Sequence, residues 1–211
     1  MKKILCYGDS NTFGFDSSTG SRFDDKTRWT AVLQANLGDD YKIIEEGGCG
    51  RTGFVDNPEG VSFSAQMHFP SVLSEVDNVD ILILAIGTND LQSQYDISFS
   101  VIEKGLENLI KIAQGKVNQI IIIPPVVLSE KIFDGYFRYQ FDETSIIKSK
   151  KIAPIYERIA NMYNCKYIDI NNFVKPSDID GLHYDKISHK IIADKLSEYI
   201  LSFVSDDKIS V

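Results

Sequence analysis

Three side chains of this sequence could together form a hydroxyl nucleophile and its base. Asp180 and His183 stand three residues apart in Asp180-Gly181-Leu182-His183, so on one turn the carboxylate can reach the Nδ1–H of the imidazole. That contact fixes the tautomer and leaves Nε2 to take a proton from the hydroxyl of Ser10. We therefore predict acyl-transfer chemistry, although Gly8-Asp9-Ser10 is also typical of a turn or a helix cap.

The chain has three histidines, which narrows the choice of base. His68 lies in Gln66-Met67-His68-Phe69-Pro70 and is expected to pack or to rim a substrate site. His189 falls in the first turn of a predicted final helix, where we expect a structural role. His183 is therefore the predicted base.

Two further segments could stabilise negative charge on an oxyanion. The glycines of Gly47-Gly48-Cys49-Gly50 let the backbone approach a ligand closely, so that an N–H could point at an oxyanion. The side-chain amide of Asn89, in Gly87-Thr88-Asn89-Asp90, could donate to the same charge. A flexible loop and an Asx-turn remain the alternatives for these two segments.

The elements that must position these residues alternate between strands and helices. Strand patterns cover Lys3–Tyr7, Tyr41–Glu45, Asp80–Ile86, Gln119–Ile123 and Lys166–Ile170. Helical patterns cover Trp29–Leu37, Ile97–Ala113, Ile146–Tyr163 and Ser188–Val204. Nearly continuous apolar strands between helices predict a three-layer, flavodoxin-like α/β/α sandwich with a mainly parallel five-stranded sheet. Ligands bind beyond the carboxyl ends of such strands, and each candidate residue follows a strand.

Composition predicts one globular domain over residues 1–204, followed by a polar, frayed tail over 205–211. The chain has 211 residues, of which 43% are hydrophobic. Its apolar runs are too short to span a membrane and it begins without a signal-peptide pattern, so we expect a cytoplasmic protein. A net charge of −8 argues against nucleic-acid binding. The three cysteines match neither a disulfide framework nor a zinc site.

The chemistry-bearing motifs, in order along the chain, resemble the four blocks of the SGNH (GDSL-like) hydrolase family. The blocks are Gly8-Asp9-Ser10, the glycines after the second strand, Gly87-Thr88-Asn89-Asp90 and Asp180-Gly181-Leu182-His183. The strings Asn11-Thr12-Phe13-Gly14, Arg28-Trp29-Thr30 and Glu45-Glu46-Gly47 are similar to a branch that holds arylesterases, bacterial acyltransferases and acetyl-xylan esterases. The resemblance implies a serine esterase or acyltransferase that needs no metal and no cofactor.

The resemblance also implies a role for each matching residue. Ser10 would be the nucleophile, His183 the base and then the acid, and Asp180 the residue that orients His183. The oxyanion hole would be formed by the N–H groups of Ser10 and Gly50 and by the side chain of Asn89. Gly50 is preferred to Gly47 because it directly precedes Arg51-Thr52. The predicted substrate-binding residues are Asp9, Asn11, Phe13 and Trp29.

The substrate and the assembly are less closely defined by the sequence. We expect a small-molecule ester with a short acyl group, including acetylated carbohydrates. Phe13, Phe15 and Trp29 could line an acyl pocket or belong to the core. Residues 128–144 are rich in aromatic side chains, which could rim the site, pack into the core or bind another subunit, and we expect a homo-oligomer. Gly53 and Tyr184 depart from residues common in the family.

Two other functions are compatible with parts of the sequence. Gly48-Cys49-Gly50-Arg51-Thr52-Gly53 matches the G-x-G-x-x-G dinucleotide fingerprint, but it follows the second strand and runs into helix-breaking Asn57-Pro58. A non-catalytic binding protein on the same fold is the second alternative. It would have no need for Ser10, Asn89, Asp180 and His183 together.

Overall fold

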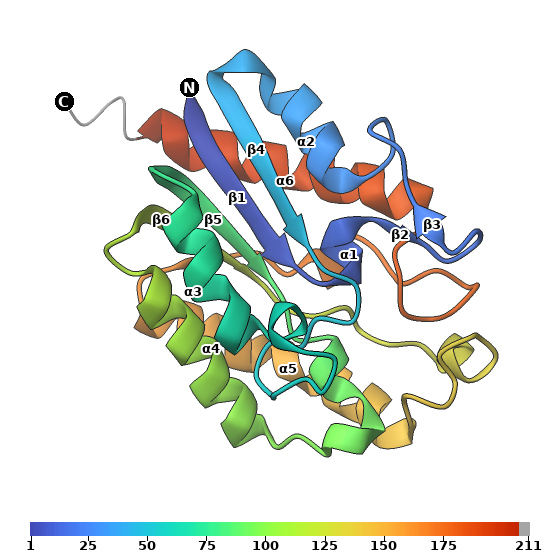
Figure 1. The fold of residues 1–211 in the computed structure, drawn as a ribbon. Coiled ribbons are helices and arrows are strands. Elements are labelled where there is room, and N and C mark those ends of the chain that lie inside the picture. The colour runs from blue at the N-terminus through green and yellow to red at the C-terminus, as the bar shows by residue number, and fades with distance from the viewer. Residues whose placement is uncertain (207–211) are drawn as a thin grey trace.

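The structure of the chain, a computed structural model, describes residues 1–206 as a parallel sheet between two layers of helices (Figure 1). The strand order is β4-β1-β5-β6-β7, and every pairing in this sheet is parallel. The strands are β1 (Lys2–Gly8), β4 (Tyr41–Gly47), β5 (Val79–Ala85), β6 (Val117–Ile123) and β7 (Lys166–Tyr167). The predicted flavodoxin-like α/β/α architecture is confirmed.

The helices cover both faces of the sheet because its central strands are apolar on both sides. Helices α2 (Trp29–Leu37) and α6 (Lys186–Asp206) lie on one face, and α3 (Ala65–Glu75), α4 (Phe99–Ala113) and α5 (Glu143–Met162) on the other (Figure 1). In β1, Ile4 to Tyr7 are fully buried, and so are Leu82 to Leu84 in β5. Right-handed crossovers between parallel strands place the helices in this way.

Local signals fix the ends of the longer helices. Ser98 caps α4 by accepting the Val101 N–H, and Asp142 and Ser145 form a capping box at the start of α5. Each helix therefore begins a few residues away from its predicted start. Helix α3 was not predicted, since Pro70 lies inside it and Pro usually ends a helix pattern.

The last strand and the tail differ from the prediction. The strand predicted over Lys166–Ile170 pairs only over Lys166–Tyr167, because the Asp169 side chain accepts the Asn171 N–H and starts a 3-10 turn. Helix α6 runs to Asp206, so the first two residues of the predicted polar tail are helical. The remainder of the tail, 207–211, lies outside the described residues.

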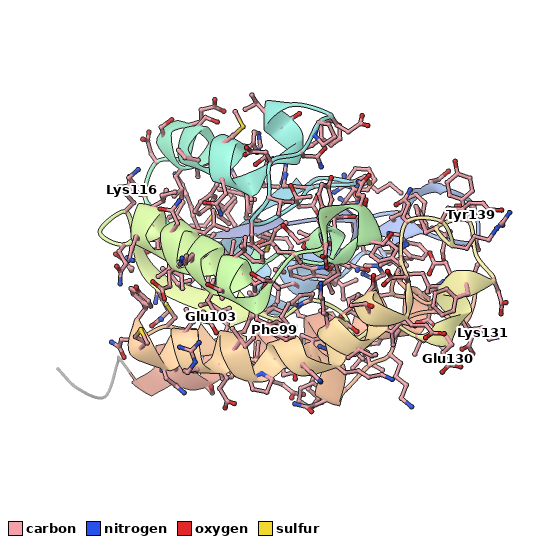
Figure 2. All side chains as sticks on the ribbon, turned by 90° about the horizontal axis from the view of Figure 1, so that it is seen from below. Phe99, Glu103, Lys116, Glu130, Lys131 and Tyr139 are labelled. Atoms are coloured by element: carbon pink, nitrogen blue, oxygen red, sulfur yellow. The ribbon has the colours of Figure 1, made fainter. Side chains whose placement is uncertain are left out.

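Short elements complete the end of the molecule where the strands finish. Helix α1 (Ser10–Phe13) follows β1 directly and leads into the β2–β3 hairpin of Phe15–Asp16 and Ser21–Arg22. The connection from β6 to α5 projects at the same end; Figure 2 shows its Tyr139 at the opposite end of the molecule from Lys116, which precedes β6. This end holds the candidate site.

Candidate active site

A chain of hydrogen bonds joins Ser10, His183 and Asp180 at the carboxyl end of the sheet. Ser10 Oγ lies 2.8 Å from His183 Nε2, and His183 Nδ1 lies 2.6 Å from Asp180 Oδ2. Asp180 Oδ1 also accepts the N–H groups of Leu182 and His183, each at 3.0 Å. The carboxylate thereby fixes both the imidazole and the turn that carries it.

Electrostatics favour an ionised Asp180. Burial raises the pKa of this carboxyl, but the hydrogen bond and charge of His183 and the two backbone donors outweigh it, so that the pKa lies below its ordinary value. An ionised Asp180 accepts a hydrogen bond from the Nδ1–H of His183. Nε2 then remains as a hydrogen-bond acceptor for the Ser10 hydroxyl. The three side chains thus have the geometry of a nucleophile, a base and an orienting carboxylate.

Ser10 stands at the first position of a helix. Asp9 is the N-cap of α1 and accepts the N–H of Asn11 at 3.0 Å. The first N–H groups of a helix have no carbonyl acceptor within the helix, so the Ser10 N–H is free to bind negative charge. Burial raises the pKa of Asp9, although hydrogen bonds from Thr88 and Asn11 oppose the shift.

Gly50 and Asn89 approach Ser10 from two other loops. Gly50 has φ +75, which favours glycine, and its N–H has no acceptor among the residues that the structure describes. Asn89 Nδ2 donates to the Arg51 carbonyl at 3.0 Å, which orients the amide beside Gly50. Gly47 ends β4 instead, where a Cβ atom would lie 2.1 Å from the Phe13 nitrogen.

A cavity of about 550 Å³ opens over these groups. Ser10, Gly50, Asn89 and His183, one from each of the four predicted blocks, line it. The remainder of its wall combines rings with amide side chains, among them Phe15, Phe63, Tyr95, Phe137, Tyr139, Gln92, Gln94 and Gln140.

The four predicted substrate-binding residues are not among those that line this cavity, and their assignment stays a prediction. Asn11 accepts the Tyr184 N–H and donates to the Leu182 carbonyl, so it holds the histidine loop. Trp29 is buried and donates its indole N–H to the Asn11 carbonyl. Phe13 lies under the Arg22 guanidinium, and Asp9 caps α1. Through these contacts the four residues stabilise the segments that carry the site.

Sequence reasoning missed the residues that hold the glycine loop. The buried Arg51 guanidinium donates to the carbonyls of Gly8 and Glu46 and pairs with the Glu46 carboxylate. Asp90 accepts three backbone N–H groups from the same loop. Adjacency to Asn89 and Gly50 in the sequence was the only signal that could have indicated them.

The other two histidines lie outside the cavity. The Nδ1 of His68, on α3, lies 3.3 Å from the Tyr7 hydroxyl, and His189 is fully buried in α6. The G-x-G-x-x-G segment makes a turn from Gly48 to Arg51 and opens no helix, which argues against dinucleotide binding. Within residues 1–206 we find neither a helix suited to crossing a bilayer nor a cluster of acidic, histidine and cysteine side chains that could hold a metal ion.

Solved structures share this fold over nearly the whole chain. The native aryl esterase of M. smegmatis is 26% identical, with 96% of this chain and 99% of that chain covered and a TM-score of 0.88. A carbohydrate acetylesterase from Sinorhizobium meliloti is 25% identical, with 96% and 100% covered and a TM-score of 0.88. A carbohydrate acetylesterase family member from the same organism is 28% identical, with 95% and 97% covered and a TM-score of 0.86. No curated protein matches the chain.

Fold and site together define a carboxylic ester hydrolase. The model of the GDSL-like lipase/acylhydrolase family matches residues 6–190. The chain belongs to that family, and the predicted resemblance is confirmed.

Proposed function

We propose that this protein is a serine esterase that cleaves short-chain esters, acetyl esters above all, of small alcohols, aryl alcohols or carbohydrates through an acyl-enzyme. The observation that carries the proposal is the hydrogen-bonded chain from Ser10 Oγ to His183 Nε2 and from His183 Nδ1 to Asp180 Oδ2. The acetylesterases among the structural neighbours support the acetyl preference.

The first half-reaction forms the acyl-enzyme. Ser10 Oγ bonds to the ester carbonyl carbon while His183 Nε2 takes the hydroxyl proton. The carbonyl oxygen becomes an oxyanion held by the N–H groups of Ser10 and Gly50 and by Asn89 Nδ2. The bond from carbon to the leaving oxygen then breaks, and His183 returns the proton to the alcohol.

The second half-reaction releases the acyl group. Water gives a proton to His183 Nε2 as its oxygen bonds to the acyl carbon, and the bond to Ser10 Oγ breaks as that oxygen regains the proton. A second alcohol in place of water gives transacylation. The chain's own residues supply the nucleophile, the base and the oxyanion donors, so we propose that the enzyme needs neither a metal nor an organic cofactor.

Hydrolysis of p-nitrophenyl acetate tests the mechanism. The Ser10→Ala variant should lose nearly all turnover, and a tritiated or mass-tagged acyl group should be trapped on wild-type Ser10 but not on the variant. Wild-type turnover by Ser10→Ala would overturn the mechanism, and an absence of turnover in the wild-type protein would favour a non-catalytic binding protein. A panel of esters that varies acyl length, with acetylated xylo-oligosaccharides included, defines the acyl preference.

A homo-oligomer in the cytoplasm completes the proposal. Tyr136 and Tyr139 are more than four-fifths exposed, at 86% and 82%, on the aromatic segment 128–144. Exposed rings of this kind favour contact between subunits. Light scattering of the purified protein, with and without Tyr136→Ser, measures the oligomeric state, and a monomer would contradict this part of the proposal.

A further inference from the structure

Two phenylalanine rings pack against the imidazole of His183. The ring centroid of Phe15 lies 4.5 Å from that of His183, and the centroid of Phe137 lies 5.3 Å from it. The two phenylalanine rings also meet each other edge-on, at 6.2 Å. Phe15 belongs to β2 and Phe137 to the aromatic segment, so residues far apart in sequence build one apolar wall beside the proposed base.

The wall is held from both sides. The hairpin that carries Phe15 pairs it with Arg22, and Arg22 in turn bonds to the Phe13 carbonyl and to Glu45. Tyr136 packs edge-on against Phe137 at 5.3 Å. Rings fixed in this way present a defined surface to a substrate instead of adapting to each one.

The position of this wall relates it to one part of the ester. This step rests on the proposed function, in which His183 Nε2 protonates the leaving alcohol. The alcohol oxygen must therefore come within about 2.6–3.2 Å of that atom. Phe15 and Phe137 line the same cavity as Ser10 and His183. We therefore expect the body of the alcohol, one bond beyond its oxygen, to face the two rings.

The rings also border a second cavity. Phe15, Phe137 and Asp180 take part in its wall, together with Ser17, Thr19 and Ile179, and its volume is about 530 Å³. The two rings therefore line both spaces.

We propose that Phe15 and Phe137 form the subsite for the leaving alcohol and select alcohols that contain a ring with an apolar face. A phenol can meet the rings edge-to-face or offset-stacked, and a pyranose can lay its C–H groups on them. Both alcohols thus offer an apolar ring face to the subsite. A small alkyl alcohol presents too little surface to gain from the wall.

Acetate esters of different alcohols test the proposal, because all of them form the same acetyl-enzyme. kcat/KM is measured by acid release for phenyl acetate, for acetylated methyl β-xylopyranoside and for ethyl acetate. Phe15→Ala and Phe137→Ala should each lower the preference for ring alcohols over ethanol by about five- to tenfold. The xyloside and phenyl arms distinguish a sugar from an aryl alcohol. Phe137→Leu keeps apolar volume but has no aromatic face, so it should lose the same preference.

Phe63→Ala is the matched control. Phe63 lines the same cavity but lies beside Gly50, and no ring contact joins it to His183 in the described part of the chain. This variant should keep the ring-to-ethyl preference within about twofold, and the ratio of phenyl butyrate to phenyl acetate should stay unchanged in the Phe15 and Phe137 variants. An unchanged ring preference in those variants, or an equal loss in Phe63→Ala, would overturn the subsite. Failure of the proposed function is recognised separately, by wild-type turnover in Ser10→Ala.

Discussion

Asp90 accepts the backbone N–H of Gly53 through Oδ2 at 2.6 Å, and this bond joins two loops of the active site. Oδ1 of the same carboxylate accepts the N–H groups of Phe54 and Val55, at 2.7 and 3.0 Å. Asp90 directly follows Asn89, and Gly53 lies three residues after Gly50. One buried side chain therefore fixes the spacing between two proposed oxyanion donors.

We predict that Asp90→Ala lowers both stability and kcat. Three N–H groups, two of them buried, lose their acceptor, which should cost about 3 kcal/mol in the free energy of unfolding. The spacing between Asn89 and Gly50 is then no longer fixed, so kcat should fall by a larger factor than KM rises. Urea unfolding and steady-state kinetics measure the two effects. Glu198→Ala, at an exposed carboxylate that pairs with Lys195, is the control and should change neither. A variant that is only less stable, with normal kcat when folded, would make Asp90 merely structural.

Asn89→Ala should retain substrate binding and lose most turnover. The side-chain amide is the one oxyanion donor that a substitution can remove without altering the backbone, and such a loss typically lowers kcat by about 10²–10³-fold. Stopped-flow or steady-state assays on p-nitrophenyl acetate give the value. An unchanged kcat would exclude Asn89 from the mechanism.

Asp180→Asn should preserve the fold and abolish most catalysis. An asparagine can still accept the Leu182 and His183 N–H groups, but its NH₂ facing Nδ1 favours the wrong imidazole tautomer. A drop of about 10⁴-fold in kcat is expected for such a change, with an unaltered circular dichroism spectrum. Asp185→Asn, at the residue that accepts the Ser188 N–H before α6, serves as the control and should keep normal kcat.

Titration of His189 should make the folded protein less stable at acidic pH. Burial lowers the pKa of this imidazole from 6.5 to about 4, and its Nδ1 accepts the Trp29 N–H. Since the folded pKa is depressed, the unfolded chain binds the proton first, so stability is lost as pH falls from 6.5 toward 4. Between about pH 7 and about pH 5 the loss should be about 2 kcal/mol. His189→Asn keeps an acceptor near Nδ1 and should flatten this dependence in urea unfolding; an equally steep dependence would assign it to other groups.

The sequence by itself determined the sheet and the candidate catalytic residues. Strands such as Ile81–Leu84 are apolar on both faces, which only a sheet covered by helices satisfies. Ser10, Asn89 and His183 each follow a strand or lie in the loop near the C-terminus, and the carboxyl ends of parallel strands meet at one edge. Local pattern and topology were sufficient to bring these groups together.

Tertiary structure alone decided what surrounds them. Trp29 and Asn11 lie next to chemistry-bearing motifs in the sequence. In the structure, however, their polar groups form hydrogen bonds with each other and with the histidine loop. The sequence left the roles of Phe15 and Phe137 open, because an aromatic residue suits a core as well as a substrate wall. Their contact with His183 depends on how two loops fold over the sheet edge, a long-range packing outcome that side-chain type and spacing do not encode.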